Sequence, residues 1–147
     1  MPLKPRSHKH LNVKLTISYF REGRHFIAYC PSLDLSAYAS LALLVQVVEP
    51  APVTTIFRVS LYDVDQQGRL EWYYMQDDSL LKKGGAGWVQ VQFPLKRFRM
   101  PPRVWDPPRN DETFDLSRIG KIEISVVTDK AVTSKGSFLV KNLVARK

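Results

Sequence analysis

Side chains that suit a hydroxyl-rich ligand recur at every second position in several stretches of this chain. They are Arg58, Ser60 and Tyr62, then Glu71 and Tyr73, then Gln90 and Gln92, with Glu123 and Ser125 as candidate additions. Arginine, amide and carboxylate groups hydrogen-bond to hydroxyls, and aromatic rings pack against the C–H faces of sugars. On neighbouring strands, a spacing of two predicts one shallow polar groove. A solvent-facing sheet surface shows the same alternation, so the pattern leaves both interpretations open.

A proline-rich segment offers a second set of binding groups. Five of the ten prolines lie between Pro94 and Pro108, so this segment lacks N–H donors for a full strand ladder and is predicted to be a stiff surface loop. It carries Trp105 together with Arg97, Arg99, Arg103 and Arg109. Tryptophan beside arginine suits contact with a sugar, an anion or a partner, and the alternative is that Trp105 caps the edge of the fold.

Groups that could perform catalysis or bind a metal lack the required spacing. His25 is the one histidine outside the first ten residues, and Cys30 directly precedes a proline. His8 and His10 have no acidic or sulfur residue close by in the sequence. We therefore predict that the chain is not an enzyme and holds no cofactor.

Alternating apolar residues predict the strands that must position these groups. Phe57, Val59 and Leu61 alternate with polar positions, and the stretches Leu70–Gln76 and Trp88–Leu95 repeat the pattern. A hairpin turn is expected at 65–68, where Gly68 can adopt a positive φ. Trp72, Tyr74 and Trp88 have the opposite phase to the polar set and are predicted to lie in the core.

The remaining stretches complete an all-β fold. The apolar run 40–48 predicts a strand buried on both faces, with a helix as the alternative. Strands are also expected over 118–128 and 138–144. Two alternating stretches around residues 21–24 predict an N-terminal β-hairpin, whose exposed edge strand could support a homodimer. The predicted class is an antiparallel β-sandwich.

Length and charge limit the organisation and the partners. The 147 residues predict a flexible basic tail over 1–10 and a single domain over 11–147. The net charge of +8 is scattered along the chain, which does not favour a nucleic-acid footprint. No apolar run approaches the roughly 20 residues that span a membrane, so no membrane partner is predicted. Composition leaves the localisation open.

Five segments follow one another in an order that is similar to galactose-binding-like jelly-roll carbohydrate-binding modules. The segments are 33–41, 57–74, 87–98, 114–122 and 136–143. The resemblance implies a jelly roll and a non-catalytic carbohydrate-binding function, accessory to a larger protein or enzyme. Many such modules carry an aspartate near the final strand that helps to bind structural calcium. This chain has Lys141 and Asn142 there, which weighs against calcium. Asp63, Asp65, Asp77 and Asp78 could still form an oxygen-rich site, but they flank turns, where aspartate is common for backbone reasons alone.

The stretch from Tyr19 to Ser36 resembles the opening hairpin of HicB-type antitoxins, through a Glu-Gly turn and a Cys-Pro-x-Leu-Asp-Leu segment. This resemblance implies an antitoxin or protein-interaction domain as the alternative function. It also admits a chimera, in which residues 11–38 have a separate origin. A third alternative is an engineered or recombined chain without an evolved function.

Overall fold

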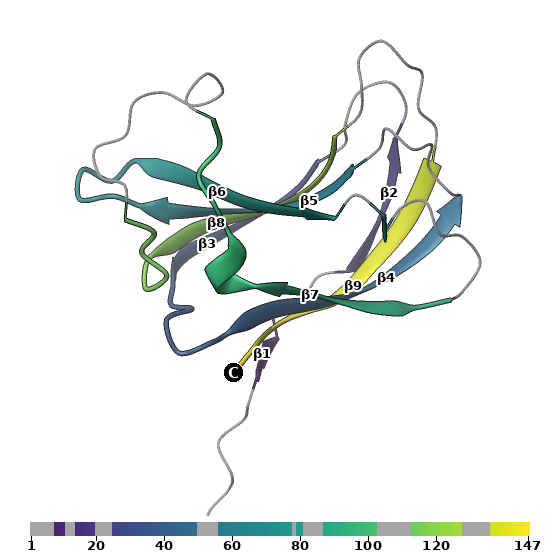
Figure 1. The fold of residues 1–147 in the computed structure, drawn as a ribbon, viewed down its shortest axis with the longest axis horizontal. Coiled ribbons are helices and arrows are strands. Elements are labelled where there is room, and N and C mark those ends of the chain that lie inside the picture. Colours follow the sequence, from purple (N-terminus) through teal and green to yellow (C-terminus); the bar gives the residue numbers. More distant parts are fainter. Residues whose placement is uncertain are drawn as a thin grey trace, which may run out of the picture.

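Two antiparallel sheets face each other in the computed structural model (Figure 1). The structure describes residues 8–10, 14–19, 25–49, 56–77, 79–80, 87–102, 113–127 and 136–147. Within them, sheet A has five strands: β1 (His8–His10), β9 (Gly136–Arg146), β4 (Ser40–Glu49) and β7 (Val89–Pro94) in that order, with β2 (Lys14–Tyr19) also beside β9. Sheet B has four: β3 (His25–Leu33), β8 (Ile119–Val127), β5 (Ile56–Val64) and β6 (Leu70–Asp77).

Aromatic rings from both sheets meet in the core. Phe57 of sheet B stacks on Phe93 of sheet A at 6.0 Å between ring centroids and meets Phe138 edge-on at 5.4 Å. All three are nearly inaccessible to solvent, and aliphatic side chains from both sheets surround them. Since Phe57 points toward sheet A, the alternate residues of β5, which include Arg58 and Tyr62, point away from it.

The predicted antiparallel β-sandwich is confirmed. The apolar run is strand β4 (Ser40–Glu49), not the alternative helix. Three consecutive residues, Leu41, Ala42 and Leu43, have exposed fractions of 0%, 0% and 1%, as expected for a strand buried on both faces. In the part of the chain that the structure describes, no helix is long and apolar enough to cross a membrane.

The predicted N-terminal β-hairpin is wrong. β2 pairs with β9 in sheet A, whereas β3 pairs with β8 in sheet B, so the two strands are not partners. Alternating sequence identifies a strand but carries no information about its neighbour, so two alternating stretches on either side of residues 21–24 do not have to pair with each other. The last three residues of the predicted tail form β1, which pairs with β9.

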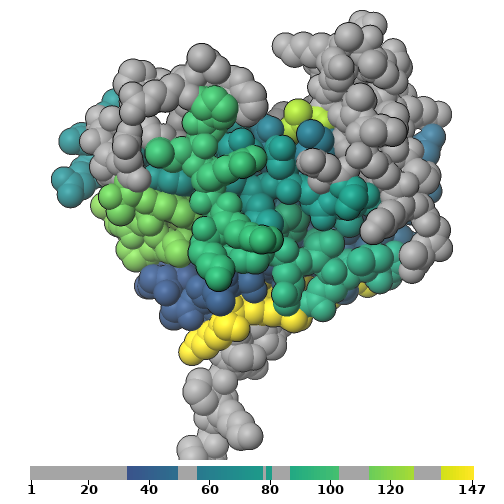
Figure 2. Space-filling view, viewed as in Figure 1, coloured from purple at the N-terminus to yellow at the C-terminus, as the bar shows by residue number. Residues whose placement is uncertain are grey.

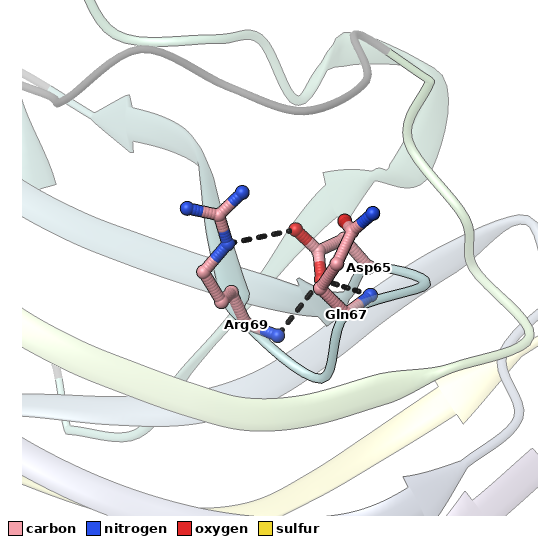
Figure 3. Close-up of polar contacts among 3 residues, drawn as sticks. All are labelled: Asp65, Gln67 and Arg69. Atoms are coloured by element: carbon pink, nitrogen blue, oxygen red, sulfur yellow. Dashed lines mark hydrogen bonds and ion pairs between the residues drawn. The ribbon is translucent and has the colours of Figure 1, made fainter.

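A buried carboxylate organises the turn between β5 and β6 (Figure 3). Asp65 Oδ1 accepts hydrogen bonds from the backbone N–H groups of Gln67 at 2.9 Å and Arg69 at 2.8 Å. The Arg69 side chain lies 3.5 Å from Asp65 Oδ2. Gly68 has φ of 78°, as predicted for a turn that needs the left-handed region. The turn fixes which residues of β5 and β6 lie opposite each other.

Replacing Asp65 should destabilise the fold. Asp65→Ala removes a buried acceptor of two N–H groups, and hydrogen bonds to charged groups contribute about 1.5–3 kcal/mol each. Both donors belong to exposed residues, so water can replace part of this loss, and we expect a net loss of about 2 kcal/mol in urea unfolding. Asp65→Asn keeps one side-chain oxygen and should lose less. The exposed Gln66→Ala is the control. Equal stability of Asp65→Ala and Gln66→Ala would contradict this role of Asp65.

Candidate functional site

The face of sheet B that points away from sheet A carries aromatic, cationic and polar side chains in three rows across the strands. We define this outer face of sheet B by the cross-strand sets Lys121–Tyr62–Trp72, Glu123–Ser60–Tyr74 and Ser125–Arg58–Gln76. Each row takes one residue from each of β8, β5 and β6, so the rows run perpendicular to the strands. The three members of the first row are partly exposed, so a ligand lying along that row would meet all three strands, whereas Ser60, Tyr74 and Ser125 of the other two rows are buried.

Three aromatic rings form a continuous patch on this face. Tyr62 and Trp72 lie parallel within 11°, with centroids 6.4 Å apart, and Trp72 and Tyr74 are 5.5 Å apart. Trp72 Nε1 donates a hydrogen bond to Ser60 Oγ at 2.9 Å, which fixes the orientation of the indole. Trp72 is partly exposed, whereas Tyr74 is buried. The patch is therefore pre-ordered, which lowers the entropic cost of binding.

Cationic groups lie over these rings. The Arg58 guanidinium carbon is 4.8 Å from the Tyr74 centroid and 5.6 Å from that of Trp72, and Nη2 donates to Gln76 Oε1 at 3.1 Å. Lys121 Nζ is 4.4 Å from the Tyr62 centroid. Cation–π contacts hold the charged groups against the aromatic patch. Hydrogen-bond donors are thus placed directly beside apolar ring surface.

Burial lowers the pKa of Arg58 from its usual value, and the nearby Tyr74, Glu123 and Tyr62 oppose that effect. Arginine keeps its charge at neutral pH because its ordinary pKa lies far above neutrality. Glu123 also lies 3.7 Å from Lys121 Nζ, so the acid of this face is close to both cations. The outer face of sheet B therefore offers fixed donors and one fixed acceptor carboxylate.

Residue 99 extends this sheet beyond β6. Tyr74 N donates to Arg99 O at 2.9 Å and Arg99 N donates to Tyr74 O at 3.1 Å. The Arg99 guanidinium carbon is 5.4 Å from the Tyr74 centroid. In Figure 2 the green surface that follows β7 lies against the teal surface of β6. Arg99 thus adds a third cation at the β6 side of the outer face.

Two of the predicted site residues, Arg58 and Tyr62, lie on the outer face of sheet B. Glu71 and Tyr73 do not, and the prediction that they share a face with Arg58 was wrong. Their exposed fractions are 5% and 3%, and Tyr73 stacks on Phe114 at 4.1 Å on the core side. The register pairs Tyr62 with Trp72, because the turn after β5 sets the phase of β6 independently of how polar its residues are.

Gln90 and Gln92 belong to β7 in sheet A, which corrects the prediction of one groove shared with Arg58. With its amide oxygen toward Arg146, Gln90 accepts hydrogen bonds from Nη1 and Nη2, both at 2.7 Å. Gln92 instead lines a cavity together with Gln76 and Arg99. Trp105 lies outside the described residues.

The predicted core position of three aromatic residues is also corrected. Trp72 and Tyr74 belong to the outer face of sheet B, although Tyr74 is buried there. Trp88 is partly exposed and lies under Lys141, with Nζ 4.0 Å from the ring centroid. β6 has aromatic residues in both phases, so alternation could not show which of them face the core.

Trp72, Tyr74 and Gln76 were not predicted as functional residues. Two features of the sequence could have indicated them. They occur at every second residue, and they follow the predicted turn at 65–68, which sets their alignment with β5. Arg99 was predicted to belong to the proline-rich segment, but nothing in the sequence placed Arg99 or Lys121 beside the rings.

The aspartates considered as calcium ligands hold backbone groups. Asp63 Oδ2 accepts from Asp115 N at 2.7 Å, and Asp77 Oδ1 accepts from Leu80 N at 3.0 Å. Asp65 organises its own turn, and Asp78 lies outside the described residues. In the described ranges, no group of three or more His, Cys, Asp or Glu residues is arranged to hold a metal ion.

No family model matches this chain, and no curated protein is similar to it in sequence. Its structure is similar to the family 11 carbohydrate-binding module of cellulosomal cellulase Lic26A-Cel5E from Clostridium thermocellum, at a TM-score of 0.67 and 16% identity, over 97% of this chain and 96% of that one. The chain has the fold of a carbohydrate-binding module. It is also similar to a family 11 module from Clostridium thermocellum in complex with a β-1,3-1,4-mixed-linked tetrasaccharide. The TM-score is 0.65 and the identity is 15%, over 95% of this chain and 86% of that one.

A family 30 carbohydrate-binding module of a Clostridium thermocellum cellulosomal cellulase shares the same module fold, at a TM-score of 0.56 and 14% identity, over 84% of this chain and 68% of that one. The expected jelly-roll fold of these modules is therefore confirmed. The matches to family 11 modules cover almost the whole chain and include the N-terminal strands. None of these three structures is named as a HicB-type antitoxin.

Proposed function

We propose that this chain is a non-catalytic module that binds a polysaccharide across the outer face of sheet B. The observation that carries the proposal is the set of three cross-strand rows, in which partly exposed aromatic surface alternates with fixed hydrogen-bonding groups. Pyranose rings present the same alternation, with C–H faces and equatorial hydroxyls. Trp72 and Tyr62 supply the apolar contact, and Arg58, Gln76 and Glu123 supply the polar contacts.

The carboxylates of this face support binding without hydrolysis. Glycosidases generally use a pair of Asp or Glu side chains on either side of the scissile bond. Among the nine residues that define the outer face of sheet B, Glu123 is the one carboxylate. The fold shared with carbohydrate-binding modules, one of which is bound to a mixed-linked tetrasaccharide, supports the same function and suggests β-glucans as the first ligands to test. The module would be accessory to a larger protein or enzyme.

Titration calorimetry against soluble polysaccharides tests the proposal. Mixed-linked β-1,3-1,4-glucan, xyloglucan, galactomannan and laminarin should be compared, and at least one should bind. Arg58→Ala should weaken that binding about tenfold or more, because the guanidinium packs on two rings and orders Gln76. Gln90→Ala, on sheet A, should bind as the wild type does. An equal loss in both variants, or no binding to any polysaccharide, would contradict the proposal.

We also propose a homodimer through the N-terminal strands, since β3 is the outermost described strand of sheet B. An edge strand has unpaired backbone groups that can pair with a second copy. Size-exclusion chromatography with light scattering at high concentration should then give twice the chain mass of 16.9 kDa. A mass that stays at 16.9 kDa would exclude the dimer.

A further inference from the structure

A cavity of about 360 Å³ is lined by residues from β6 of sheet B and β7 of sheet A. The described residues that line it are Met75, Gln76, Asp77, Ser79, Gln92, Phe93 and Arg99. Met75 and Phe93 are largely buried and supply an apolar base, whereas Ser79, Gln92 and Arg99 are exposed. The volume is at the small end of ligand pockets, which hold about 300–1,000 Å³. It suits one sugar ring, not a chain.

The cavity adjoins the outer face of sheet B. Gln76 belongs to both, because its Oε1 accepts from Arg58 at 3.1 Å while the residue lines the cavity. Arg99 lines the cavity and also lies over Tyr74. The second and third rows therefore lead across β6 toward this opening. Because Ser60 and Tyr74 of the second row are buried, a polysaccharide would reach the cavity over the partly exposed Arg58 and Gln76 of the third row, and would place its end, or a side branch, there.

The charged groups of the cavity favour an uncharged sugar. Asp77 is fixed, because Oδ1 accepts from Ser79 N at 2.9 Å, Ser79 Oγ at 3.0 Å and Leu80 N at 3.0 Å. Asp77 and Arg99 form no ion pair with each other in the described part of the chain. A sugar hydroxyl can donate to the Asp77 carboxylate and accept from the Arg99 guanidinium, and these opposite charges leave the described lining with no net charge to select an ionic substituent.

We infer that this cavity is a subsite for a single neutral pyranose residue of the polysaccharide bound on the outer face of sheet B, either its terminal residue or a one-residue side branch. The inference rests on the proposed function. Gln92 is the diagnostic residue, because it reaches the cavity from sheet A and takes no part in the cross-strand rows. It is exposed, so its replacement should leave the fold intact.

Calorimetry with two ligand sets tests the inference and distinguishes a terminal sugar residue from a side branch as the occupant of the cavity. The first set is long linear mixed-linked glucan and its tetrasaccharide, and the second is the branched polymers xyloglucan and galactomannan. Gln92→Ala should weaken the affinity for the ligand set that the wild type binds more tightly by about five- to tenfold, the range for loss of one or two hydrogen bonds. Loss only for the tetrasaccharide identifies a terminal residue, and loss only for a branched polymer identifies a branch.

The controls keep this inference distinct from the proposed function. Gln66→Ala, at an exposed turn position outside both the cavity and the cross-strand rows, should change the binding of every ligand less than threefold. Tighter binding of a uronate or sulfated polymer than of any neutral one would overturn the neutral-sugar assignment. Unchanged binding of every ligand by Gln92→Ala, while Arg58→Ala loses binding, would reject the subsite and leave the proposed function standing. If neither Gln92→Ala nor Arg58→Ala weakened the binding of any ligand, both the subsite and the proposed function would be rejected.

Discussion

Trp72→Ala is expected to weaken polysaccharide binding about thirtyfold, which corresponds to roughly 2 kcal/mol and is typical of a tryptophan at the centre of a binding surface. Trp72 is the central ring of the aromatic patch, 6.4 Å from Tyr62 and 5.5 Å from Tyr74. Its removal takes away the largest apolar surface available to a sugar ring and leaves Arg58 without one of its two supporting rings. Calorimetry with the best-bound polysaccharide measures the loss.

Trp88→Ala is the matched control, because it removes the same side chain from the region of sheet A where Lys141 lies. It should bind polysaccharide within about twofold of the wild type. A Trp72→Phe variant keeps an aromatic ring and should recover part of the affinity, while any ligand-induced change in the fluorescence of Trp72 disappears. If Trp88→Ala lost more affinity than Trp72→Ala, the ligand would lie on sheet A instead.

Phe57→Ala is expected to destabilise the fold by about 4 kcal/mol, within the usual range for a fully buried phenylalanine. Its exposed fraction is 0%, and its ring contacts Phe93 and Phe138 across the space between the sheets. Truncation leaves a cavity that two stiff sheets cannot close completely. Urea unfolding followed by far-UV circular dichroism measures the change, and a variant that no longer folds would agree with it.

Phe57→Leu refills most of that cavity and should cost only about 1–2 kcal/mol. The comparison separates lost volume from lost aromatic contact. A loss below 1 kcal/mol in Phe57→Ala would mean that the two sheets are not held together through this ring, which would contradict the inward orientation of β5 on which the outer face of sheet B depends.

The strands were predictable because their signals are local. β5 alternates Phe57, Val59 and Leu61 with polar residues, and this periodicity arises from the geometry of a single strand. The turn that follows it needs one glycine with positive φ, and Gly68 supplies it. The apolar content of β4 likewise reflects a strand that is covered on both faces.

Only some residues of the site could be predicted, because the side chains that share a face depend on how neighbouring strands are aligned. Glu71 is charged and was therefore expected to face solvent, yet it is buried at 5% exposure. Trp72 is large and apolar and was expected in the core, yet it lies on the outer face of sheet B. Polarity alone could not decide between these two neighbours, whereas the pairing of Tyr62 with Trp72 does.

Partner strands were the least predictable feature. Gln90 and Gln92 follow β6 in the sequence, but their strand lies in the other sheet, as consecutive strands of a sandwich often do. β2 and β3 are likewise adjacent in sequence and lie in different sheets. These long-range choices depend on burial of the whole core, which no short stretch of sequence contains.

The most direct test of the binding face is a titration of isotope-labelled protein with mixed-linked glucan tetrasaccharide, or with whichever oligosaccharide calorimetry selects, followed by amide chemical shifts. We predict the largest shifts in 58–62, 72–76 and 121–125, the cross-strand rows of sheet B. Smaller shifts are expected near Gln92 and Arg99 at the cavity. Shifts confined to β4, β9 and Gln90 would place the ligand on sheet A and contradict the account.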